Sequence, residues 1–77
     1  MRTLIARSPS LGPQHVEEAI KESGIAVTER LMGDRARTRH SAEAVIVVWD
    51  GGNENVLRVA GWARLRGLPR YVHTVER

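Results

Sequence analysis

The chain has 77 residues, fewer than the common domain of about 100 to 150, so we expect one hydrophobic core and a single domain over residues 1–77. Hydrophobic residues make up 42% and charged residues 27%, which excludes a disordered chain, and the lack of cysteine excludes disulfides and thiolate chemistry. The net charge of +3 arises from 12 basic and 9 interspersed acidic residues, so nucleic-acid binding is permitted but not indicated.

The first two elements are predicted to be a strand and an amphipathic helix. Thr3–Ala6 is a short apolar run, and the turn-forming residues 7–10 end it, as expected for a buried strand. Pro13 suits the first turn of a helix, and apolar residues then recur at helical spacing over residues 16–20. Gly24 is expected to end this helix.

The middle of the chain predicts an edge strand, a loop and a central strand. Residues 25–32 alternate and carry charges, which suits an edge strand, whereas the polar, Arg-rich residues 33–43 predict a loop with a short helix. Val45–Val48 has four β-branched residues in a row, as in a strand buried on both faces. The longest apolar run, Ala44–Trp49, is far short of the ~20 residues that span a bilayer. We therefore expect a cytoplasmic protein without membrane contact.

The last two elements complete a parallel sheet. Asn53 is a suitable N-cap for a helix over residues 53–66, which Gly67 ends, and residues 70–75 alternate as a final edge strand. Helical crossovers and the central position of the two most apolar strands predict an α/β fold. The prediction is a small four-stranded parallel sheet in the order 2-1-3-4 with two main helices.

Ligands of open α/β sheets bind outside the carboxyl ends of the strands, where the strand order reverses. Here the loops after the first and third strands meet at that point. One loop has an Arg and a Ser, which bind phosphate well; the other has a carboxylate, two glycines and a helix N-terminus, which attracts anions. The predicted ligand-binding residues are Arg7, Ser8, Asp50, Gly51, Gly52, Asn53 and Glu54.

Each of these residues also has a purely structural interpretation. The two glycines suit a tight strand-to-helix turn that Asn53 caps, and Arg7 and Ser8 suit a solvated loop. Glu54 has the position of a general base at the mouth of a crevice, but complementing the helix dipole is its more ordinary role. No catalytic residue is assigned.

The remaining candidates are the histidines, the arginines and the aromatic residues. His15, His40 and His73 fall on a helix start, a loop and an edge strand, without metal-ligand spacing, so we predict neither a metal site nor a cofactor. The basic stretch 35–40 lacks the aromatic residues of a stacking platform, so we do not expect a nucleic-acid partner. Trp62 borders the apolar helix face, where partial exposure would suit a protein contact.

Two segments carry a family resemblance. Residues 42–51 read Ala-Glu-Ala-Val-Ile-Val-Val-Trp-Asp-Gly, and residues 63–69 read Ala-Arg-Leu-Arg-Gly-Leu-Pro. Together they resemble the YspA-like branch of the SLOG superfamily of Rossmann-like domains, a branch of small bacterial and phage proteins. Residues 53–56 stand where that branch has Ser-x-Gly-Thr, so the chain resembles an abridged, divergent member. The resemblance implies a nucleotide or nucleotide-derivative site at the edge chosen above.

Two functions follow as expectations. The first is a non-catalytic Rossmann-like domain that binds a nucleotide or a similar phosphorylated metabolite. The alternative is a degenerate phage or bacterial module for protein interaction, or a homodimer, since small domains gain stability by covering apolar surface. An enzyme that cleaves an N-glycosidic bond would depend on Glu54 and fold analogy alone, so enzymatic activity is not favoured.

Overall fold

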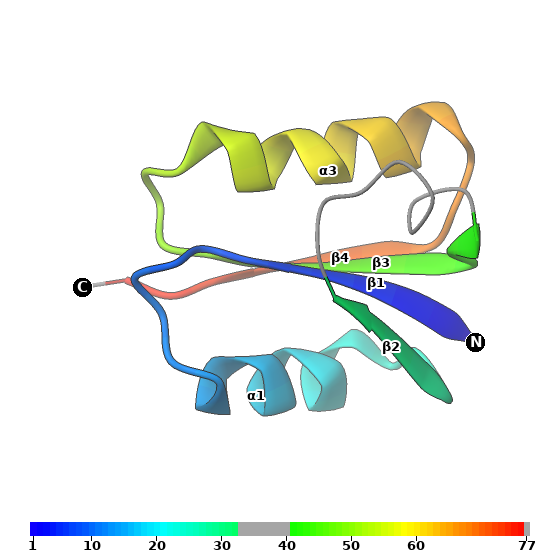
Figure 1. The fold of residues 1–77 in the computed structure, drawn as a ribbon, viewed down its shortest axis with the longest axis horizontal. Coiled ribbons are helices and arrows are strands. Elements are labelled where there is room, and N and C mark those ends of the chain that lie inside the picture. Colours follow the sequence, from blue (N-terminus) through cyan, green and yellow to red (C-terminus); the bar gives the residue numbers. More distant parts are fainter. Residues whose placement is uncertain (33–40, 77) are drawn as a thin grey trace.

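In a computed structural model, which describes residues 1–32 and 41–76, a parallel sheet lies between two helices that cover its opposite faces (Figure 1). The sheet has four strands in the order β2-β1-β3-β4, and each neighbouring pair is parallel, as the sequence predicts. The strands are β1 (Arg2–Arg7), β2 (Glu29–Met32), β3 (Ala44–Trp49) and β4 (Arg70–Thr74), and the helices are α1 (Gln14–Ser23) and α3 (Glu54–Leu65).

The core has two halves, one on each face of the sheet. On the α3 face, Leu4 of β1 packs with Val45 and Val47 of β3 against the helix. On the α1 face, Ile5 and Ile46 pack against the other helix. Because β3 contributes to both halves and Ala44 to Val48 are fully buried, the prediction of a central strand is confirmed.

Both main helices begin and end where the sequence predicts. Asn53 caps α3, since its side chain accepts a hydrogen bond from the backbone N–H of Val56 at 3.3 Å. Gly24 after α1 and Gly67 after α3 have φ of 69° and 68°, the left-handed conformation that glycine adopts without steric cost.

The second strand is shorter than predicted. Strand β2 pairs with β1 from Arg2↔Glu29 onward, and Ile25 and Val27 lie before it, packed against the α1-side core. Before this ladder, the N-terminal ammonium of Met1 donates to the carbonyl of Ala26 at 2.7 Å, and the backbone N–H of Thr28 donates to the carbonyl of Met1 at 3.0 Å. The short helix predicted within residues 33–43 falls mainly on residues 33–40, outside the described residues. Neither described helix is long and apolar enough to cross a membrane.

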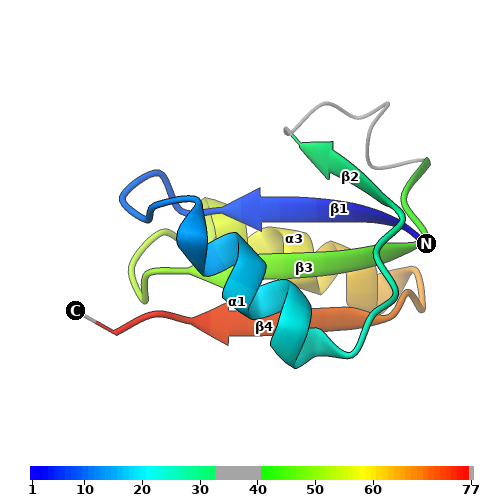
Figure 2. The same cartoon turned by 90° about the horizontal axis from the view of Figure 1, so that it is seen from below.

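The loops after β1 and β3 lie side by side at one end of the sheet, as both views show (Figures 1 and 2). The backbone N–H of Ser8 donates to the carbonyl of Val48 at 2.9 Å, so the ladder between the two strands continues into the first loop. The carboxyl ends of the central strands therefore bring together the two segments in which the sequence places a site.

Candidate functional site

The two loops are tied to each other by hydrogen bonds. The backbone N–H of Asp50 donates to Ser8 Oγ at 3.1 Å, and Ser10 Oγ donates to Asp50 Oδ2 at 2.7 Å. Ser8 is fully buried, so its hydroxyl acts inside the protein as an acceptor for the neighbouring loop. Strand order thus predicts the meeting of the loops, and the loops meet through their own polar groups.

The Asp50 carboxylate takes the place that an anion would occupy at the start of α3. Its Oδ1 accepts hydrogen bonds from the backbone N–H groups of Gly52 at 2.9 Å and Asn53 at 3.0 Å. The hydrogen bond from Ser10, and then those from the two backbone groups, hold the pKa of Asp50 well below its usual range. A phosphate that used the same donors would have to displace this carboxylate and meet its negative charge.

The side chains of Arg7 and Trp49 also donate hydrogen bonds to backbone carbonyls of these loops. Arg7 Nη1 donates to the carbonyl of Leu11, which fastens the guanidinium to its own loop, although a guanidinium has five N–H donors in all. The indole N–H of Trp49 donates to the carbonyl of Asn53 at 2.9 Å. The second loop is therefore held at both of its ends.

The two glycines and Glu54 have different structural roles. Gly51 has φ of 88°, so the turn requires glycine there, whereas Gly52 has no positive φ. A Cβ on Gly52 would lie 3.7 Å from Asp50 Oδ1, an ordinary contact. Glu54 is exposed in the first turn of α3, where its charge complements the helix dipole.

A pocket of about 250 Å³ opens beside these loops on the α3 side of the sheet. Of the seven predicted residues, Arg7 and Asn53 line it, and Asn55 adds a second side-chain amide. The other five do not line it. Its apolar wall is formed by residues of β1, by Met32 at the end of β2, and by residues of α3 that include Val56. The first-turn position of Asn55 and Val56 is the signal by which the sequence could have included them.

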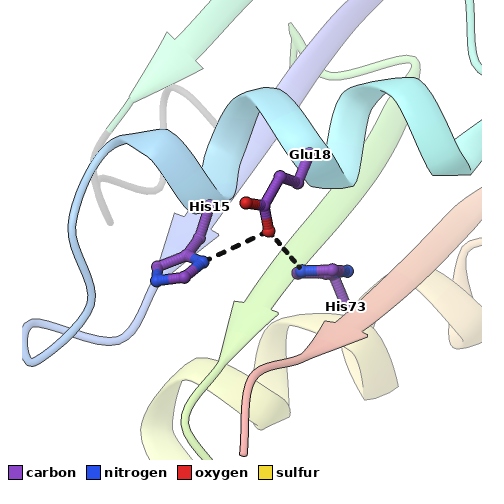
Figure 3. A group of neighbouring side chains, drawn as sticks. All are labelled: His15, Glu18 and His73. Carbon is purple, nitrogen blue, oxygen red and sulfur yellow. Dashed lines mark hydrogen bonds and ion pairs between the residues drawn. The ribbon is translucent and has the colours of Figure 1, made fainter.

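The structure contains a second cluster of polar side chains, which was not predicted from the sequence. His15 and Glu18 of α1 lie beside His73 of β4, with one ligand atom of each residue within 4.8 Å of the others (Figure 3). His15 and Glu18 are three residues apart on one helix, but the third member is 55 positions further along the chain. Only the packing of α1 against β4 reveals the cluster, and His40 lies outside the described residues.

Glu22 of α1 extends this cluster along the edge strand β4. Its Oε2 accepts a hydrogen bond from the hydroxyl of Tyr71 at 2.9 Å and lies 2.8 Å from His73 Nδ1. The Tyr71 hydroxyl, and then the His73 ring, lower the pKa of Glu22, while the bond to Glu22 raises the pKa of Tyr71. These three side chains form a connected hydrogen-bonded group on the α1 face.

No family model, curated protein sequence or solved structure matches the chain. Function is therefore inferred from the geometry of the two places described above, the pocket beside α3 and the histidine cluster beside α1.

Proposed function

We propose that this domain binds a small nucleotide or a similar phosphorylated metabolite in the pocket beside α3. The observation that carries the proposal is the composition of the pocket wall, which is largely apolar, with Arg7, Asn53 and Asn55 as its polar members. Ligand sites commonly combine an apolar surface with a few polar groups that orient the ligand. The resemblance to the SLOG superfamily supports the same ligand class.

The size of the pocket and the position of Asp50 limit the kind of ligand that the pocket could bind. Ligand pockets usually enclose about 300 to 1,000 Å³, and this one, at about 250 Å³, suits a nucleoside monophosphate better than a dinucleotide. Because Asp50 already accepts from the backbone N–H groups of Gly52 and Asn53 just before α3, the phosphate would pair with the Arg7 guanidinium. The base or sugar would lie against Val56 and receive hydrogen bonds from Asn55.

Thermal shift and calorimetric titration with nucleosides, nucleoside monophosphates and sugar phosphates test this proposal. Asn55→Ala should weaken binding of the best compound about fivefold, the loss expected for one hydrogen bond of roughly 1 kcal/mol. Glu54→Gln is the matched control, since Glu54 is exposed next to Asn55 but does not line the pocket. Val56→Trp, which fills the pocket, should abolish binding. A panel in which no compound raises the melting temperature would refute the proposal.

A second candidate is a protein-interaction or dimerisation module without a ligand. Two observations favour it. Asp50 already binds the backbone N–H groups of Gly52 and Asn53 in the turn before α3, and Leu65 near the end of α3 is 89% exposed. Arg66 stacks over the half-buried Trp62 in the same region, 5.8 Å from the ring centroid. Sedimentation over a range of concentrations tests it: association that Leu65→Lys removes would support this candidate, and a monomer at every concentration would contradict a homodimer.

A further inference from the structure

The side chains of His15, Glu18 and His73 converge on one point between α1 and β4 (Figure 3). Glu18 Oε2 lies between the two rings, 3.3 Å from His15 Nδ1 and 3.5 Å from His73 Nε2. The His73 side chain is only 12% exposed, whereas Glu18 is 55% exposed, so the point is reached from solvent past the carboxylate.

Both distances exceed the usual 2.9 to 3.0 Å of an N–H···O hydrogen bond. They fit the spacing of ligands around a metal ion. Bonds of about 2.0 to 2.1 Å from zinc to nitrogen and oxygen place the ligand atoms of a tetrahedron roughly 3.3 to 3.4 Å apart. Two of the three edges, at 3.3 and 3.5 Å, are close to this length, and the third, between the histidines, is at most 4.8 Å.

The surroundings of His73 assign its two ring nitrogens different roles. Nδ1 lies 2.8 Å from Glu22 Oε2, the closer of its two carboxylate contacts, so a neutral ring carries its proton there. Nε2 then has a lone pair that faces the Glu18 carboxylate, an arrangement that a cation between them would stabilise. Metal-bound histidines usually donate their other N–H to a carboxylate in this way, and Tyr71 holds that carboxylate in place with a hydrogen bond of 2.9 Å.

We propose that His15, Glu18 and His73 bind a zinc ion, with Glu22 as the positioning residue that orients His73. Two imidazoles and one carboxylate suit zinc and not magnesium, which prefers oxygen ligands in an octahedron. Three protein ligands leave a fourth position for water. The bound ion would join α1 to β4 on the face of the sheet opposite the nucleotide pocket, so this site does not depend on the function proposed above.

Titration of the untagged chain with zinc chloride tests the site. Native mass spectrometry should detect one zinc per chain. At about 100-fold excess over the dissociation constant, the melting temperature should rise by at least about 5 °C, because the ion binds the folded state. Magnesium chloride should have no effect. Cobalt(II) should acquire the intense visible absorption of tetrahedral coordination, a readout that does not depend on stability.

Substitutions distinguish the proposed zinc ligands from the residues around them. Glu18→Gln and His73→Gln should lose the zinc-induced shift and the cobalt spectrum, whereas Glu22→Gln should lower zinc affinity about 10- to 100-fold and retain the spectrum. Glu17→Gln is the matched control, since it removes the same charge from the adjacent position of α1, where Glu17 pairs with Arg30. Circular dichroism without metal confirms that each variant folds.

Three results would overturn the proposal. One is the absence of both the zinc shift and the cobalt spectrum in the parent chain. Another is a response that persists in folded Glu18→Gln and His73→Gln. The third is a stoichiometry of half a zinc per chain, which would mean that two chains share the ion.

Discussion

At the scale of single residues, Asp50 holds together the loop after β3 through its hydrogen bonds. Its carboxylate accepts from Ser10, Gly52 and Asn53, and these bonds lower its pKa in the folded chain relative to the unfolded chain. Such a group stabilises the fold above its unfolded pKa of about 3.9, and this contribution is lost as the pH falls through the lower, folded value. Asp50 is therefore an acid-sensitive structural residue.

The pH dependence is tested by urea unfolding of the parent chain and Asp50→Asn between pH 6 and pH 2. Asn keeps an acceptor oxygen but does not titrate, so the variant should be less stable at pH 6 and the difference between the midpoints should narrow towards pH 2. Glu17, Glu22 and Glu43 also have lowered pKa values, but both proteins share these groups. A difference that stays constant over the whole range would contradict the assignment.

The adjacent glycines of the same loop differ in what the backbone requires. Gly51→Ala should lower the free energy of unfolding by about 1 to 2 kcal/mol, because φ of 88° is strained for a residue with a Cβ. Gly52→Ala should change it by less than about 0.5 kcal/mol, since its φ is not positive and a Cβ meets only an ordinary contact. Urea denaturation at pH 7 measures both. Equal losses would contradict the structural account of the turn.

At the scale of elements, the sequence predicts each helix and strand whose signal is local. Val45–Val48 identifies the central strand by its unbroken β-branched run, and Asn53 identifies the start of α3 by its capping side chain. The start of β2 is not a local property. It depends on where this segment pairs with β1, a contact between residues far apart in the chain, so alternation alone places the strand too early.

For the candidate sites too, some features follow from the sequence and others depend on contacts between distant residues. Strand order predicts that the loop of Ser8 meets the loop of Asp50, but it does not predict that their polar groups satisfy each other, because that depends on side-chain geometry. The histidine cluster depends on which residues of α1 face β4. His15 and Glu18 are three residues apart on α1, but the third member, His73, is far along the chain, and no local spacing connects it with them.

At the scale of the whole molecule, stability depends on one strand that contributes to both halves of the core. Ile46 of β3 is fully buried on the α1 side, between the central strands and the helix. A chain of this size has a free energy of unfolding in the lower part of the usual range of about 5 to 15 kcal/mol. The loss of a single large core side chain therefore removes a large share of the total.

Ile46→Ala should destabilise the domain by about 2 to 5 kcal/mol, because it removes buried methyl groups and leaves a cavity in the core. Leu65→Ala deletes a similar volume from a side chain that is 89% exposed, and should change stability by less than about 0.5 kcal/mol. Thermal and urea unfolding of both variants at low protein concentration measure the contrast. A large loss in Leu65→Ala would contradict the exposure of this side chain described above, because it would show that Leu65 is buried in solution against a second chain.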